Sequence, residues 1–142
     1  MIKKLLSPGS GDNTLSLSLL LLRIAGGAMM LTHGIGKFNR LTGDGPIKFA
    51  DPLGIGVEAS LYLTVFAEVF CAIFLIAGFA TRLSAIPLTI TMLVAAFIVH
   101  AEDGFGKQEL PLMYIAMYLV LILQGAGKFS LDSLLFRRFR KE

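Results

Sequence analysis

Two charged side chains interrupt otherwise apolar stretches of the sequence. Arg23 lies in a leucine-rich run ten residues before His33, and Glu68 lies in a second apolar run ten residues after Glu58. On two antiparallel helices with a rise of ~1.5 Å per residue, both charges would lie ~15 Å from the same membrane surface. An unpaired charge at that depth would cost several kcal/mol, so the sequence predicts an ion pair between Arg23 and Glu68.

Two interpretations of this pair stay open. A buried arginine and carboxylate can recognise a quinone head group or relay protons, because charged residues inside membrane spans often mark such sites. The same pair can instead be a packing clamp that fixes the register of two helices.

A second set of polar residues is expected at the helix ends. His33 and His100 end the first and third apolar runs, while Glu58 and Glu109 begin the second and fourth, so these side chains should gather on one face. The histidines could ligate a haem or a metal ion, or act as acid/base groups in a quinone or thiol redox step. They could also be polar residues where helices meet water, which is the commonest case. Haem ligation is the least expected, and equal depth does not establish that the histidines converge.

The elements that would position these residues are four apolar runs. The chain is 55% hydrophobic and 16% charged with a mean hydropathy of +0.74, so 142 residues cannot hide this much apolar surface in a water-soluble core. A membrane-spanning helix needs about 20 mostly apolar residues. The expected spans are residues 15–32, 59–80, 83–99 and 105–124. The predicted fold is all-α, a single domain over residues 1–142 built as a four-transmembrane-helix bundle.

The segments between and beyond the predicted spans also carry structural signals. Residues 33–58 hold six glycines and two prolines and are expected to form a loop that caps the outer end. Residues 130–142 alternate apolar residues with arginines, which predicts an amphipathic segment in the membrane interface. The leucine-rich start is read as a retained first span rather than a signal peptide, because a polar turn and Arg23 interrupt it.

Lysines and arginines are unevenly divided between the two predicted surfaces, which predicts that both termini are cytoplasmic. One surface carries Lys3, Lys4, Arg82, Lys128, Arg137, Arg138, Arg140 and Lys141, and the other carries Lys37, Arg40, Lys48 and Lys107. A net charge of +3 without a basic stripe argues against nucleic acid as a partner. The single cysteine, Cys71, excludes a cysteine-cluster metal site, and no metal site is expected.

Several short motifs together resemble the DoxX family over nearly the whole chain. They are residues 21–25 around Arg23, residues 33–38 from His33 to Phe38, Glu68, residues 78–82, residues 109–114, and residues 125–132. The family is named for a subunit of an archaeal thiosulfate:quinone oxidoreductase, and relatives are described as membrane parts of redox or oxidative-stress assemblies. The resemblance implies a four-helix membrane bundle in which Arg23, His33, Lys37, Glu68 and Glu109 form a shared polar site. His100 joins this set on the depth argument alone.

The function expected from these observations is that of an integral membrane subunit of a quinone-linked oxidoreductase or oxidative-stress complex in a prokaryotic inner membrane. No strand–glycine loop–helix unit is present to hold a flavin or nucleotide, so a quinone or a partner protein would carry electrons. The alternatives are a non-catalytic scaffold for a redox partner and a small transporter, which the lack of inverted half-helices disfavours. Whether the protein is catalytic, its electron donor, its quinone and whether it forms a homo-oligomer stay open.

Overall fold

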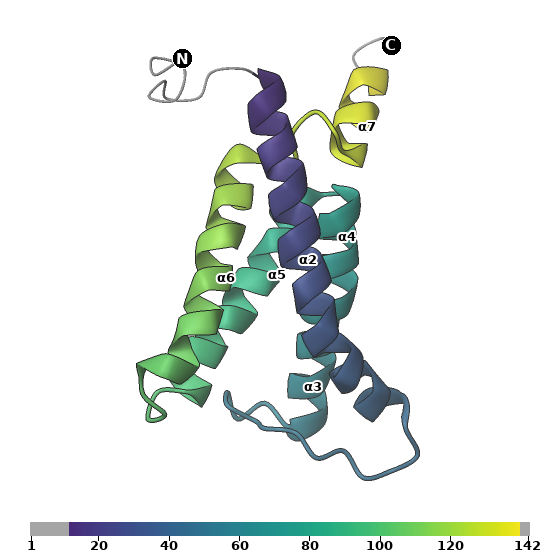
Figure 1. The fold of residues 1–142 in the computed structure, drawn as a ribbon. Coiled ribbons are helices and arrows are strands. Elements are labelled where there is room, and N and C mark those ends of the chain that lie inside the picture. Colours follow the sequence, from purple (N-terminus) through teal and green to yellow (C-terminus); the bar gives the residue numbers. More distant parts are fainter. Residues whose placement is uncertain (1–11, 140–142) are drawn as a thin grey trace.

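The structure, a computed structural model, describes the backbone of residues 12–139 and the side chains of residues 13–138. Within that range every regular element is helical (Figure 1). Four helical spans are long and apolar enough to cross a membrane: Asn13–Thr42, Val57–Ala77, Thr81–Val99 and Phe105–Gln124. The chain is therefore a helical membrane protein, as its composition predicted.

The first and fourth spans are single α-helices, α2 (Asp12–Thr42) and α6 (Phe105–Gln124). The second is divided into α3 (Val57–Val65), the π-helical segment η1 (Phe66–Cys71) and α4 (Ala72–Ala77). The third comprises α5 (Thr81–Val94) and a second π-helical segment, η2 (Ala95–Val99). Single π-helical turns inside α-helices occur frequently at functional sites, so η1 and η2 are candidate positions for such a site.

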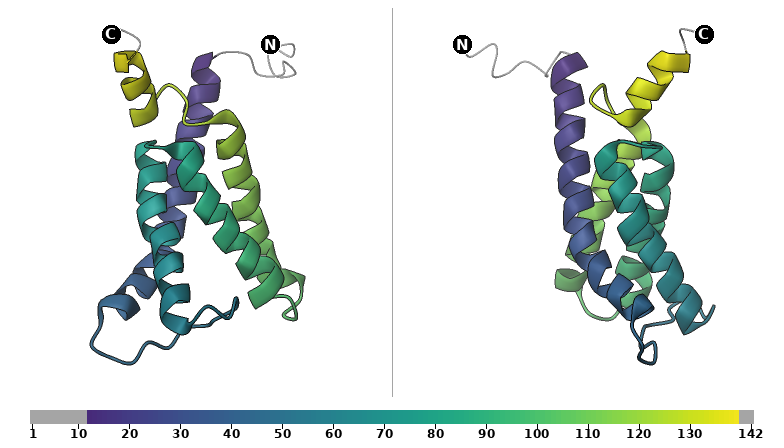
Figure 2. Two further views of the ribbon diagram at one scale, coloured as in Figure 1. Left: turned by 180° about the vertical axis from the view of Figure 1, so that it is seen from behind. Right: turned by 90° about the vertical axis from the view of Figure 1, so that its right-hand side faces the viewer.

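The four spans converge at one end of the molecule and diverge at the other (Figures 1 and 2). At the first end, which we call the terminal end, α2 begins and the short helix α7 (Leu131–Phe139) lies beside the turn between α4 and α5. The opposite end, the loop end, holds the connections 43–56 and 100–104. Since α5 contacts α4 and η1 but diverges from α3, the bundle is loosest at the loop end.

Two glycines on one face of α2 allow the second span to approach closely. A Cβ atom at Gly27 would lie 2.5 Å from Ile76 Cγ1, and one at Gly34 would lie 2.7 Å from the Glu68 carbonyl oxygen. Small residues commonly permit such contacts between membrane helices. Gly34 thereby brings α2 against the segment that carries Glu68.

The core lies in the middle of the bundle, and the bundle exterior is apolar. Leu75, Leu88, Tyr118 and Leu121 are fully buried. Large apolar side chains on the outside, including Leu21, Leu83 and Leu123, are more than half exposed. An exterior with this many exposed apolar side chains fits a bundle surrounded by lipid rather than water.

The first helix is longer than predicted. It does not end near His33 but continues nine residues further to Thr42, so the connecting loop is residues 43–56. At ~1.5 Å per residue, 31 residues span ~46 Å, which exceeds a ~30 Å hydrocarbon layer and carries the polar last turns into the head-group region. Hydropathy alone placed the end too early, because it detects the apolar layer and not the helix itself.

Candidate functional site

A partly buried ion pair joins the first and second spans near the loop end. Lys37 Nζ lies 2.5 Å from Glu68 Oε1 and 2.6 Å from Oε2. The Glu68 side chain is only 3% exposed, whereas that of Lys37 is 27% exposed. An ammonium group has three N–H bonds, so both contacts to the carboxylate leave one N–H that can reach a ligand.

The predicted ion pair between Arg23 and Glu68 is wrong. Glu68 is paired with Lys37, while Arg23 donates hydrogen bonds to main-chain carbonyls nearer the terminal end. The depth estimate counted from His33 as the end of the first helix. Because α2 continues to Thr42, Arg23 lies 19 residues from that end, and Lys37 is the residue opposite Glu68.

Arg23 is fully buried and connects three segments. Its Nη1 donates to the carbonyl oxygens of Leu75 (3.3 Å) and Ile76 (3.2 Å), and its Nη2 donates to that of Phe129 (2.5 Å). The first two carbonyls belong to the last turn of α4, where a helix leaves its C=O groups without intrahelical partners. Arg23 therefore acts as a structural clamp between α2, α4 and the segment before α7.

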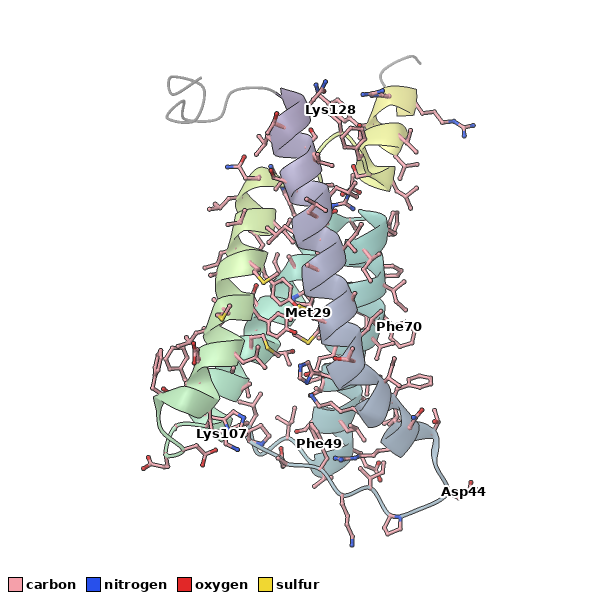
Figure 3. All side chains as sticks on the ribbon, viewed as in Figure 1. Met29, Asp44, Phe49, Phe70, Lys107 and Lys128 are labelled. Carbon is pink, nitrogen blue, oxygen red and sulfur yellow. The ribbon has the colours of Figure 1, made fainter. Side chains whose placement is uncertain are left out.

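Two cavities flank the Lys37–Glu68 pair. The α3–α5 cavity, of about 340 Å³, lies between those helices and under residues 49–55 of the loop. The α2–α6 cavity, of about 380 Å³, lies between α2, the start of α6 and the third span. Both volumes are within the range of small-molecule sites, which is ~300–1,000 Å³. Figure 3 shows Phe49 from the loop and Lys107 from α6 at this end of the molecule.

The lining of the two cavities differs in chemistry. The α3–α5 cavity is bordered mainly by apolar side chains, among them Phe49, Leu53, Ile90 and Val94. The α2–α6 cavity is richer in polar side chains: His33, Lys37, Glu68, His100, Lys107 and Tyr114. The ion pair, Ala95 and His100 border both cavities, so the two spaces meet at the charged residues.

The two predicted histidines face the same cavity but have separate partners. The His33 ring contacts the Tyr114 ring edge-to-face at a centroid distance of 6.2 Å. His100 Nδ1 lies 2.7 Å from Asp103 Oδ2, and Gln108 Nε2 donates to the His100 carbonyl oxygen. Both rings can reach a ligand in the α2–α6 cavity and exchange protons with it.

Tyr114 is a polar residue of this cavity that the sequence did not single out as part of the site. It is 2% exposed, and within residues 13–138 its hydroxyl has no hydrogen-bond partner. The neighbouring Tyr118 differs, because its hydroxyl donates to the Gly26 carbonyl oxygen. Leaving a buried hydroxyl unsatisfied costs about 1–3 kcal/mol, so its position calls for a partner.

A carboxylate in the loop holds the wall of the α3–α5 cavity in place. Asp51 Oδ1 accepts hydrogen bonds from the Ile55 amide and the Ser60 hydroxyl, and Oδ2 accepts one from the Gly56 amide. The Ser60 hydroxyl, followed by the Gly56 amide, lowers the pKa of the Asp51 carboxyl below its ordinary range. The sequence signal for this arrangement is Asp51-Pro52 just before a helix with Ser60 in its first turns, a pattern that did not enter the predicted site.

The remaining predicted site residue, Glu109, lies apart from the others. It is exposed in the second turn of α6 and borders neither cavity. The structure therefore brings together His33, Lys37, Glu68 and His100, and leaves Arg23 and Glu109 outside this group. A mostly apolar space with an ion pair, two imidazoles and a phenol can bind a flat polar head group and move protons to or from it.

Comparisons with known proteins agree with the sequence resemblance. A family model described as DoxX matches residues 18–101. A curated but uncharacterized protein of Haemophilus influenzae is 35% identical over 125 residues, which cover 83% of this chain and 83% of that protein. A second uncharacterized protein of the same organism is 30% identical over 128 residues, covering 84% of this chain and 92% of its own length. No solved structure matches the chain.

Proposed function

The chain belongs to the DoxX family of membrane proteins, and on that premise we propose that it is the quinone-binding membrane subunit of a redox complex. The observation that carries the proposal is the Lys37–Glu68 pair at the junction of two cavities inside a bundle surrounded by lipid. A buried charge pair that only holds two helices together needs no adjoining space.

The roles of the residues follow from their positions. Lys37 donates a hydrogen bond to a quinone carbonyl oxygen, and Glu68 holds the ammonium group in place through both of its oxygens. His33 and His100, on the wall of the α2–α6 cavity, supply or accept the protons that accompany quinone reduction. Electrons come from a partner protein, since residues 12–139 are all helix and connection and contain no strand–glycine loop–helix unit for a flavin or nucleotide.

The first experiment is to measure quinone in protein purified gently from its native membrane, by solvent extraction and absorbance. We expect near-stoichiometric quinone in the wild type and at least a tenfold loss of affinity in Lys37→Met and Glu68→Gln, about 1.4 kcal/mol or more. Lys48→Met and Glu58→Gln are matched controls, because both residues are exposed and border neither of these cavities.

Either outcome of this experiment is informative. Retention of quinone in folded Lys37→Met and Glu68→Gln would show that the ion pair is not part of the quinone site. Quinone no more abundant in the wild type than in bulk lipid would instead favour a non-catalytic scaffold that anchors a redox partner. The Arg23 clamp suits that second role, because it rigidifies the terminal end without contributing to either cavity.

We further propose that the terminal end faces the cytoplasm of a prokaryotic cell. Arg82, Lys128, Arg137 and Arg138 lie at this end, in or beside the α4–α5 turn and α7. Lys3, Lys4, Arg140 and Lys141, which were predicted for the same side, fall outside the described residues. Of the four basic residues at the loop end, Lys37 is paired with Glu68. The difference in free positive charge between the two ends is therefore larger than the residue counts alone give. A membrane-impermeant maleimide on intact cells should label Asp44→Cys and leave Arg138→Cys unlabelled; the reverse pattern would invert the topology.

A further inference from the structure

The α3–α5 cavity reaches the lipid-facing surface of the bundle. Two residues on its border, Leu63 and Ile90, are 58% and 54% exposed. Leu63 is seven residues into its span and Ile90 is nine residues from the end of the next one, so both lie at the depth of the hydrocarbon layer. The mouth of this cavity therefore opens sideways, toward lipid tails.

The α2–α6 cavity contains a hydrogen-bond donor, the Tyr114 hydroxyl, that has no acceptor among residues 13–138. The Tyr114 ring contacts the His33 ring edge-to-face and stacks on the Tyr118 ring at a centroid distance of 5.8 Å with an interplanar angle of 21°. Because Tyr114 is only 2% exposed, its hydroxyl faces the interior of the bundle rather than water or lipid. The hydroxyl is thus preorganised for an acceptor that enters the cavity.

We propose that the two cavities are the two halves of one amphiphile site. The head group lies in the α2–α6 cavity with a carbonyl oxygen accepting a hydrogen bond from Tyr114, and the apolar chain lies in the α3–α5 cavity and leads out between Leu63 and Ile90. The halves adjoin at Lys37 and Glu68, which border both. This assignment rests on the proposed function and adds to it the position of each part of the ligand, with Tyr114 as a specificity-determining residue.

The test uses two probes and two variants of the full chain in lipid nanodiscs. The probes are a benzoquinone with a decyl chain and the same ring with a methyl group in its place. Tyr114→Phe should weaken binding of both probes by about tenfold, because it removes one hydrogen bond to the shared head group. Val94→Trp, which fills the apolar half, should weaken the decyl probe and leave the methyl probe unchanged.

Each variant has a matched control elsewhere in the bundle. Tyr62→Phe alters an exposed tyrosine on α3, and Val120→Trp alters an exposed valine on α6, and neither residue borders the two cavities. Both controls should bind both probes like the wild type. Tyr114→Phe should also leave the ligand-free melting temperature unchanged or raised, because the hydroxyl has no partner to lose within the described residues.

The outcomes separate this proposal from the function on which it rests. If the wild type binds neither probe, the quinone function fails and this assignment fails with it. If the wild type binds both probes but Tyr114→Phe and Val94→Trp behave like their controls, the quinone function stands and the two-part site is overturned. A ligand-free melting temperature that falls in Tyr114→Phe would assign the hydroxyl a structural role and also overturn it.

Discussion

Arg23 and Glu68 are both charged and buried, but their charges are satisfied by different kinds of partner. Glu68 has a charged side chain, Lys37, at hydrogen-bond distance, and the pair adjoins open space. Arg23 donates hydrogen bonds to main-chain carbonyl oxygens, and Asp132 lies close enough to attract it electrostatically. The planar guanidinium suits this position, because it presents five N–H donors in fixed directions and can serve several carbonyls at once.

This difference leads to a prediction for Arg23. Arg23→Leu removes the side-chain donor of the Ile76 and Phe129 carbonyls and should lower the free energy of unfolding by roughly 3 kcal/mol. Arg23→Lys should recover only part of this, since one ammonium group cannot reach both sets of carbonyls. The double variant Arg23→Glu, Glu68→Arg should be no more stable than Arg23→Glu alone. Unfolding in detergent micelles measures all four variants, and rescue by the charge swap would restore the original pairing hypothesis.

Two secondary-structure elements, η1 and the stretch of α2 that faces it, together position the ion pair. The π-helical turn carries Glu68, and Gly34 allows α2 to lie against the backbone of that turn. Lys37, one turn further along α2, is then close enough for its side chain to reach the carboxylate. The ion pair thus depends on how closely two helices approach, not only on the two charged residues.

Replacing Gly34 tests this dependence. In Gly34→Ala the new Cβ would lie 2.7 Å from the Glu68 carbonyl oxygen and 2.8 Å from Val69 Cγ2, so the helices must separate. We expect a lower melting temperature and weaker quinone binding. Gly36→Ala is the control, because nothing lies within 4 Å of its Cβ and alanine favours a helix by about 1 kcal/mol. A rise in melting temperature for both variants would show that Gly34 is not required for close packing.

At the scale of the whole molecule, the loop end is open because the spans diverge there, and the loop partly closes it. Residues 49–55 form one wall of the α3–α5 cavity, and Asp51 holds this stretch on the first turns of α3. The predicted capping loop therefore exists, although it is shorter than expected. The position of the loop depends on the Asp51 carboxylate, which is outside the membrane spans, so its protonation follows the pH of the surrounding water.

The loop should consequently loosen in acid. The folded-state pKa of Asp51 is lowered, so the stabilisation from its hydrogen bonds is fully present above the ordinary aspartate pKa and is lost as the pH falls through the lower, folded-state value. Limited proteolysis of residues 43–56 should be slow at pH 7 and accelerate below about pH 4. Asp51→Ala should be cleaved rapidly at both pH values. A wild-type cleavage rate unchanged between pH 7 and pH 3 would contradict the proposed anchor.

The sequence by itself determined the class of the protein and the number of its spans. Fourteen or more consecutive apolar residues need an apolar surrounding whatever their neighbours are, so the fourth span, Phe105–Gln124, was predicted with the observed bounds. The polar residues that interrupt or flank these runs were also recognisable, because a charge in lipid needs a partner. His33, Glu68 and His100 were identified from these positions and Lys37 through the family resemblance, and all four line the α2–α6 cavity.

Only the tertiary structure decided which of these residues meet. The continuation of α2 to Thr42 replaced Arg23 by Lys37 as the partner of Glu68, and the divergence of α5 from α3 created the space beside the pair. That the Tyr114 hydroxyl has no partner in the described part of the chain is likewise a property of its surroundings. The physical reason is that hydropathy reports how apolar the environment of a segment is on average. Contacts between side chains depend on where helices end, how they tilt and how closely small residues let them approach.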